Sequence, residues 1–485
     1  MLPCLSRFRK HHQHNDVQDS KPRKFLWFIP LATNTHPLQF FAFLLAVFVA
    51  MTIVVYTSAS QAVIISTMLH ISDSSGDVTG SLALYGEIIA LAMVVFWGTM
   101  SDRIQKRTVY CISILFMGLA VCLYPQVNSL YPGLLLLKLV FSAGSAGCTT
   151  MMAAMMTDVV HGKGGLVSGL IGACSGLGAI FAAFVLFAVP AKIGVATKSP
   201  VQGVVVGWGI IGGCVMFLGV VLWFCLPKSK QGPTEAIYIR IKKGILAGKD
   251  PRISLAFVTS FFARADEIII TSFISLWVNQ YYIDVGQCKV GSPCYMAMGT
   301  TGAMTGIAQS VSLASAPFFG LASEYLPRPY PIIAAGLIGA AGCFPFAFSF
   351  DPTSKSSLAF VILIAVGELG MIISGMAMLN GRYVPQDLRG SISGTYSFIG
   401  ALGIIVISKI GGVLFDKWMK GGPFLLLGIG HCLVSVFSVV VLLMNKRLER
   451  KDRLQEERER EQEQDQMVSS QEFESFEYHS SEIKN

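Results

Sequence analysis

The sequence has few charged residues. Of its 485 residues, 14% are Asp, Glu, Lys or Arg, whereas soluble domains carry roughly a quarter. With 53% hydrophobic residues, a chain of this length cannot hide its apolar surface in a water-soluble core. The composition therefore argues against a soluble globular protein and favours an integral membrane protein.

Sequence motifs for nucleotide binding, metal binding and catalysis are also missing. No Gly-x-x-x-x-Gly-Lys-Ser/Thr phosphate loop occurs, which argues against a nucleotide-driven pump. No His, Cys and carboxylate set has metal-ligand spacing, and no nucleophile–base pair is visible. We therefore expect no metal, no cofactor and no enzymatic activity. The formal net charge of +8 is interpreted as membrane orientation rather than as nucleic-acid binding.

Apolar runs of about twenty residues, long enough to cross a bilayer as a helix, recur along the chain. They predict an all-α polytopic membrane protein with twelve transmembrane helices in two six-helix pseudo-symmetric bundles. The predicted spans are Phe40–Met68, Leu82–Met100, Thr108–Val127, Leu134–Met156, Leu166–Pro190, Val204–Leu226, Ile253–Tyr281, Met296–Leu321, Ile332–Phe350, Leu358–Met378, Ile392–Leu414 and Phe424–Met444.

Loop charge predicts the orientation. Basic residues concentrate in alternate loops, and such loops stay in the cytoplasm, so an even number of spans places both termini there. The membrane is the plasma membrane or an endomembrane such as the vacuole. The basic central loop is interpreted as an interfacial segment attracted to anionic lipid. The predicted regions are a cytoplasmic segment (1–37), an N-terminal bundle (38–227), the central loop (228–252), a C-terminal bundle (253–445) and a charged, disordered cytoplasmic tail (446–485).

A charged run follows the second span, from Gly98 to Arg107. A similar run, from Gly320 to Arg328, follows the eighth span at the same place in the hydropathy pattern. A charged hairpin repeated once in each half indicates a transporter built from two related halves.

This arrangement resembles the major facilitator superfamily over residues 38–445. The family's loop signature reads Gly-x-x-x-Asp-Arg-x-Gly-Arg-Arg. Gln105 stands where the family usually has glycine. The matching positions are Gly98, Asp102, Arg103, Lys106 and Arg107. The resemblance implies that a small organic solute moves by alternating access, without a chemical change.

The two hairpins are expected to act as conformational gates. Gly98 allows close helix approach, and Asp102 can accept hydrogen bonds from a helix N-terminus, where the dipole is positive. The basic residues that follow can bind carboxylates of the other bundle; alternatively, they serve as an orientation signal with lipid contacts. The residues assigned to gating are Gly98, Asp102, Arg103, Lys106, Arg107, Gly320, Glu324 and Arg328.

Ionisable side chains inside spans are costly and usually face a cavity. In the seventh span, Arg264 and Glu267 are three residues apart and share a helical face, whereas Asp266 points elsewhere. Glu368 lies near the centre of the tenth span. In the resembled fold, spans one, four, seven and ten line the central cavity, which places Arg264 and Glu368 on neighbouring walls. This mixed charge does not select a cationic or an anionic substrate.

Two interpretations of these residues remain open. In one, Arg264 is neutralised by Glu267 or Glu368 and only fixes helix register. In the other, one carboxylate binds and releases a proton during the cycle, and Arg264 recognises substrate or resets that carboxylate.

Three further ionisable residues lie inside other spans. Glu87, in the second span, is either a second proton site or a packing partner. Lys138, near the outer end of the fourth span, either contributes to the site or extends to the interface. Lys409, near the outer end of the eleventh span, is expected to extend to the interface.

Cys288 and Cys294 share one short loop on the predicted non-cytoplasmic side. They form either a disulfide, given an oxidising compartment, or two free thiols.

The favoured function is a secondary active transporter that moves a small-molecule substrate through the lipid bilayer, coupled to protons or another coupling ion. A facilitative uniporter is the nearest alternative. A non-transporting membrane receptor or scaffold on the same fold is another, since a fold does not determine a function.

Overall fold

The computed structural model describes residues 24–25, 29–30, 35–71, 74–159, 164–228, 237–289, 294–379, 384 and 389–444. Ten helices in these ranges are long and apolar enough to cross a membrane. Residues 251–284 and 295–325 form two more long helical segments, which makes twelve. Charged and polar residues lower the hydropathy of these two. The predicted all-α architecture is confirmed, whereas the exact region boundaries stay predictions.

The N-terminal half contains six spans, and local sequence signals start several of its helices. Pro37 occupies the first turn of α1, where its missing N–H costs nothing, and His36 forms a capping box with Gln39. Ser199 caps α7 in a similar way. The elements are α1 (Pro37–Thr67), α2 (Ser75–Arg103), α3 (Lys106–Leu123), η1 (Tyr124–Gln126), η2 (Leu130–Leu134), α4 (Leu135–Val159), α5 (Gly164–Phe181), η3 (Ala182–Leu186), α6 (Ala188–Thr197) and α7 (Pro200–Cys225).

The C-terminal half repeats this organisation after α8 (Ile237–Ala247), a short helix in the predicted central loop that packs against the start of α14. The half contains α9 (Pro251–Ile268), η4 (Ile269–Phe273), α10 (Ile274–Asp284), α11 (Tyr295–Tyr325), α12 (Pro329–Ala347), α13 (Lys355–Leu379), α14 (Arg389–Lys417) and a last helix over residues 422–444. Outside the halves, β1 (Lys24–Phe25) pairs with β2 (Ile29–Pro30) in antiparallel fashion.

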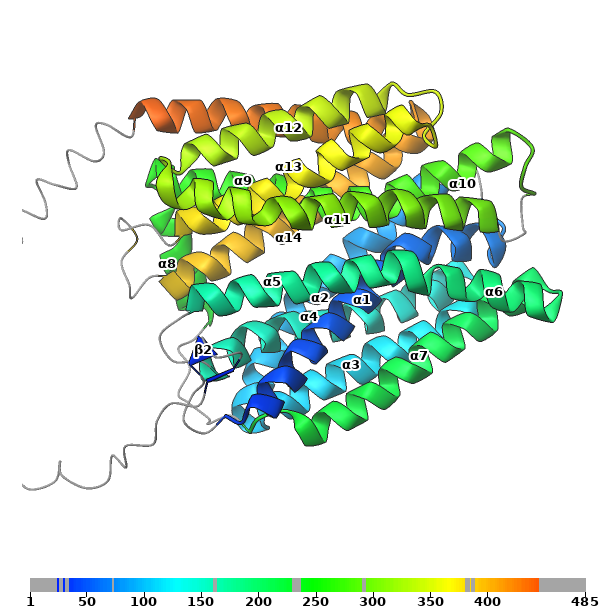
Figure 1. Cartoon of the computed structure of the whole chain (residues 1–485), viewed down its shortest axis with the longest axis horizontal. Coiled ribbons are helices and arrows are strands. Elements are labelled where there is room, and N and C mark those ends of the chain that lie inside the picture. Colours follow the sequence, from blue (N-terminus) through cyan, green and yellow to red (C-terminus); the bar gives the residue numbers. More distant parts are fainter. Residues whose placement is uncertain are drawn as a thin grey trace, which may run out of the picture.

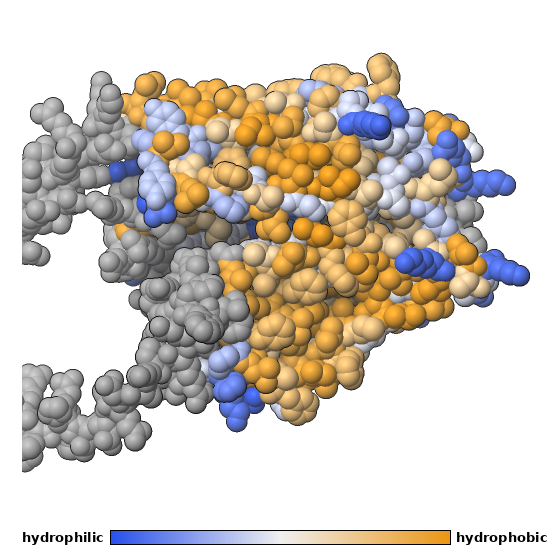
Figure 2. Space-filling model, viewed as in Figure 1, coloured by the Kyte–Doolittle hydropathy of each residue, from blue (hydrophilic) through white to orange (hydrophobic). Residues whose placement is uncertain are grey.

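Each half has its own apolar core. In the N-terminal half the rings of Tyr124 and Trp208 stack, and in the C-terminal half Trp277 packs against Phe346 and Phe424. The two halves lie one above the other in Figure 1, with α8 at one end and α6 and α10 at the opposite end. Hydrophobic side chains cover the middle of the face seen in Figure 2, and hydrophilic ones gather towards its ends, as a membrane-spanning protein requires.

The halves are joined at the end that carries α6 and α10, which is the predicted outer end. There the Ser275 hydroxyl donates to the carbonyl of Ala59 over 2.5 Å, and Gly302 of α11 lies directly against Ala183 of η3. Towards the other end, no atom of the described residues outside the helix's own backbone lies within 4 Å of a Cβ position at Gly98 or Gly320. The structure is therefore closed at the predicted outer end.

The second span begins earlier than the sequence predicted. Helix α2 starts at Ser75 rather than near Leu82. Small and polar residues in its first two turns lower the hydropathy, but they let α2 approach α14 closely: Gly76 and Gly80 both lie against the α14 backbone or its side chains. Close helix packing in lipid favours such small residues.

Candidate functional site

Arg264 and Glu267 form an ion pair in the middle of the seventh span. Arg264 Nη1 lies 3.1 Å from Glu267 Oε2, one helical turn along α9. The Arg264 side chain is 43% exposed although Ala263 and Ala265 beside it are buried, so it faces the space between the halves. Gly400 of α14 provides room for it, because a Cβ there would lie 2.7 Å from Arg264 Cγ. The predicted shared face of Arg264 and Glu267 is present in the structure.

Two charged residues of the N-terminal half lie opposite this pair. Glu87 of α2 is within electrostatic range of Arg264, Glu267 and Lys138. The aliphatic part of Lys138 packs against Gly86, the residue before Glu87. Lys138 therefore faces α2 and the interior instead of extending to the membrane surface. A charged network thus joins α2 and α4 of one half to α9 of the other.

Glu368 extends this network into the C-terminal half. It lies on α13, is only 6% exposed, and is within electrostatic range of Arg264, Glu267 and Asp266. Among the described residues, no hydrogen bond to its carboxyl group is found. An unpaired charge buried in this way is costly. The charge that Glu368 can carry therefore depends on how closely Arg264 approaches it.

Asp266 has a different partner, which the sequence analysis missed. Its carboxylate lies 3.0 Å from Nε2 of His431 in the last helix, and both side chains are fully buried. The two groups are in close contact without an aligned hydrogen bond. Gly339 of α12 leaves space for the imidazole. A histidine inside an apolar span was the available signal, but nothing in its local sequence indicated a partner on α9.

The described contacts of the hairpin residues lie mostly within one half. Lys106 donates to the carbonyl of Ala154 at the end of α4 over 3.2 Å, and Arg107 lies over the ring of Trp223 in α7. Arg103 and Glu324 are exposed, and Arg328 is partly buried. The side chain of Asp102 lies outside the described residues. The gating roles of all these residues therefore stay predictions.

Lys409 has partners on α2 that the sequence analysis did not predict. Its ammonium group lies 2.7 Å from Asp77 Oδ1 and 2.7 Å from Ser81 Oγ, both on α2. The residues are 332 positions apart in sequence, so only the docking of the two halves brings them together.

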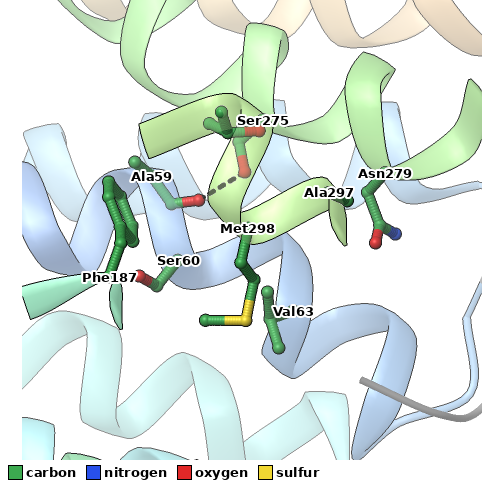
Figure 3. Close-up of a pocket in the computed structure, with 9 residues that line it drawn as sticks. Ala59, Ser60, Val63, Phe187, Ser275, Asn279, Ala297 and Met298 are labelled. Carbon is green, nitrogen blue, oxygen red and sulfur yellow. Dashed lines mark hydrogen bonds between the residues drawn. The ribbon is translucent and has the colours of Figure 1, made fainter. Parts of the chain in front are cut away.

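A small pocket lies between the halves at the predicted outer end and has a volume of about 240 Å³, including the open space at its mouth. Figure 3 shows residues of α1, α10 and α11 around it. The hydroxyl oxygens of Ser60 and Thr301, both at most 2% exposed, have no described partner there. The charged network lies outside this pocket. Within the described ranges, no three His, Cys, Asp or Glu side chains come together as metal ligands.

Cys288 and Cys294 are joined by a disulfide in the structure. We expect neither thiol to react with a maleimide in the protein isolated without reductant, and both to react after reduction. The measurement is mass spectrometry of labelled peptides, with the buried Cys343 as an internal control for unfolding. Equal labelling of both thiols before and after reduction would contradict the disulfide.

The fold and the site define a multi-pass membrane protein whose two six-helix halves enclose charged side chains between them. The family model described as Major Facilitator Superfamily matches residues 40–406 and 255–476. The chain belongs to this superfamily, a family of transporters.

Individual relatives are distant. The magnetosome protein MamH of Paramagnetospirillum magneticum is 26% identical over 409 residues, covering 81% of this chain and 89% of MamH. The synaptic vesicular amine transporter of Homo sapiens is 31% identical over 137 residues, covering 27% of this chain and 26% of that protein. Among solved structures, a D-xylose-proton symporter superimposes with a TM-score of 0.64 at 12% identity, covering 82% of this chain and 97% of that one.

Proposed function

We propose that this protein is a secondary active transporter that moves a small organic solute by alternating access, coupled to protons. The observation that carries the proposal is the charged network between the halves, formed by Glu87, Lys138, Arg264, Glu267 and Glu368. Ionisable groups inside the membrane are costly to bury, so those that are present usually serve a function such as transport. Relatives named as a proton symporter and an amine transporter support the same function.

The residues have distinct proposed roles. Arg264 is the partly exposed cation that a solute entering from the end opposite the joined one would meet, and Glu267 holds it in place. Glu368 is the proposed proton carrier, because it is buried and no hydrogen bond to it is found among the described residues. When a solute draws Arg264 away, Glu368 loses its nearby positive charge and would take up a proton. Glu87 and Lys138 lie on the opposite side of the proposed site, in the N-terminal half.

The gates and the orientation belong to the same proposal. The hairpin residues around Asp102 would hold one conformation and release in the other, and Lys106 and Arg107 would anchor that hairpin to its own half. Both termini and α8 would lie in the cytoplasm, and the joined end of the halves would face outward.

The test is transport by the purified protein in proteoliposomes with an imposed pH gradient, screened against candidate solutes in both directions. Solute flux that follows the pH gradient supports coupling. Flux that ignores the gradient would indicate a uniporter, and the absence of flux for every solute class would favour a receptor or scaffold.

Replacement of Glu368 by glutamine is expected to separate transport from the pH gradient. Glutamine keeps the size of the side chain but cannot exchange a proton, so solute exchange should persist while accumulation falls about tenfold or more. The measurement compares gradient-driven uptake with equilibrium exchange. Asp284→Asn, which alters an exposed carboxylate at the end of α10, is the matched control and should keep both gradient-driven uptake and equilibrium exchange. Normal pH dependence in Glu368→Gln would refute its role.

A further inference from the structure

Helices α2 and α14 resemble one another in a way that the hairpin repeat does not explain. Both are 29 residues long, and they run antiparallel at the interface between the halves. When they are aligned from their first residues, glycines and an aspartate coincide. The coinciding pairs are Gly76 with Gly390, Gly80 with Gly394, Gly86 with Gly400, Gly98 with Gly412, and Asp102 with Asp416. Such a pair indicates an inverted repeat.

At the predicted outer end, the aspartate of α14 binds the beginning of α2. Asp416 accepts hydrogen bonds from the backbone amides of Gly76 over 3.0 Å and of Asp77 over 2.6 Å. The first amides of a helix have no partner within the helix, and its N-terminus is the positive end of the dipole. A carboxylate from one half therefore caps a helix of the other half.

An ion pair and close backbone packing strengthen this contact. Lys409, two turns before Asp416, binds Asp77 and Ser81 of α2. A Cβ on Gly80 would overlap the carbonyl of Ser408, and one on Gly412 would overlap the carbonyl of Gly76. Larger residues at these glycines would push the two helices apart.

Two aligned glycines at the opposite end of the same helices lack such a contact. Among the described residues, no atom outside their own helix backbone lies within 4 Å of a Cβ position at Gly98, the counterpart of Gly412, or at Gly394, the counterpart of Gly80. The helices are antiparallel and have matching residues. The contact between Asp416 and the beginning of α2 at the outer end could therefore have an equivalent at the opposite end, between Asp102 and the beginning of α14.

We propose that Asp416 and Lys409 form an outer latch, defined here as their contacts with Gly76, Asp77 and Ser81. The outer latch holds the halves together at the predicted outer end. When it opens, Asp102 caps the beginning of α14 in the same way, so one pair of helices supplies both end contacts in turn. The proposal rests on alternating access as the proposed function. It adds Asp416 and Lys409 as positioning residues for the conformational change.

The first test measures access to the closed end without any solute. Ser60→Cys introduces a thiol that is buried between the halves at the predicted outer end. In nanodiscs, a bulky water-soluble maleimide should label it about tenfold faster when Asp416→Ala or Lys409→Ala is added, since a helix cap and an ion pair are lost. The chain without Ser60→Cys gives the background of its own cysteines. Lys417→Ala, the exposed neighbour of Asp416, is the matched control.

A charge exchange separates the latch from a general loss of stability. Asp77→Lys and Lys409→Asp should each speed labelling, and the two together should restore the slow rate because the ion pair is rebuilt with its partners reversed. Restoration would not follow if either variant acted by misfolding. Labelling at the unmodified rate in Asp416→Ala and in both single charge variants would overturn the outer latch.

A cross-link tests the equivalent contact at the other end. Val94 occupies the position in α2 that Ser408 occupies in α14, and Ser408 contacts Gly80. Cysteines at Val94 and at Gly394, the counterpart of Gly80, should therefore cross-link slowly in the unmodified protein and several-fold faster with Asp416→Ala. If Asp416→Ala does not change the cross-linking rate, the proposal that the helix contact forms at the opposite end when the outer latch opens is wrong. None of these readouts requires transport, so they stand even if no transported solute is found.

Discussion

Replacement of Arg264 by alanine is expected to reduce solute transport by up to about 100-fold. Arg264 is the partly exposed cation at the centre of the charged network, and its removal leaves Glu267, Glu87 and Glu368 with less compensating positive charge. The solute proposed to bind Arg264 loses a charge-assisted hydrogen bond worth up to about 3 kcal/mol, which corresponds to about 100-fold in rate. The measurement is the initial rate of uptake in proteoliposomes, normalised to folded protein.

Two related variants make this result specific. Arg264→Lys keeps the charge but loses the planar group that binds a carboxylate through two nitrogens, so transport should recover only in part. Gly400→Ala should also lower transport while leaving every charge in place, because the new methyl group would displace Arg264. Uptake by Arg264→Ala at the unmodified rate would show that Arg264 only stabilises α9.

Replacement of His431 by alanine is expected to destabilise the protein by at least about 1–3 kcal/mol, the cost of leaving the buried carboxyl group of Asp266 without its partner. His431 and Asp266 are both fully buried, so water cannot replace either of them. The measurement is thermal unfolding in detergent, followed by tryptophan fluorescence. The neighbouring Cys432→Ala serves as the control and should change the unfolding temperature little, since Cys432 is only partly buried.

The double replacement Asp266→Asn with His431→Gln separates ionisation from packing. It removes both ionisable groups and retains polar side chains of similar size, so it should be more stable than His431→Ala. If His431→Ala unfolds at the same temperature as the unmodified protein, the buried contact of Asp266 with His431 does not hold the last helix against α9. Transport by a stable double variant would show that Asp266 is not needed for proton movement.

The membrane spans and their number could be predicted because lipid imposes a local rule. Each span must satisfy its own backbone hydrogen bonds, so it needs a continuous apolar run that is visible in the sequence. The rule worked even for the seventh span, where Arg264, Asp266 and Glu267 lower the hydropathy below that of an ordinary span. It failed at the start of α2, where Gly76 and Gly80 serve contact with α14 rather than contact with lipid.

The site was predictable in part, for a similar reason. A charge inside a span is conspicuous, and helical spacing correctly placed Arg264 with Glu267 and directed Asp266 elsewhere. Spacing along one helix says nothing about the partner on another helix. His431 was therefore missed, and so was the pairing of Lys409 with Asp77, which is distant in sequence.

By itself, the sequence determined the class of protein, the spans and the set of buried charges, because these follow from composition and from the periodicity of single helices. The tertiary structure alone decided which ionisable groups lie near one another: Glu87 and Arg264 across the two halves, Asp266 and His431, and Lys409 and Asp77. It also decided which end of the molecule is closed. These contacts depend on how two six-helix halves dock, and that docking is a property of surfaces assembled from residues hundreds of positions apart.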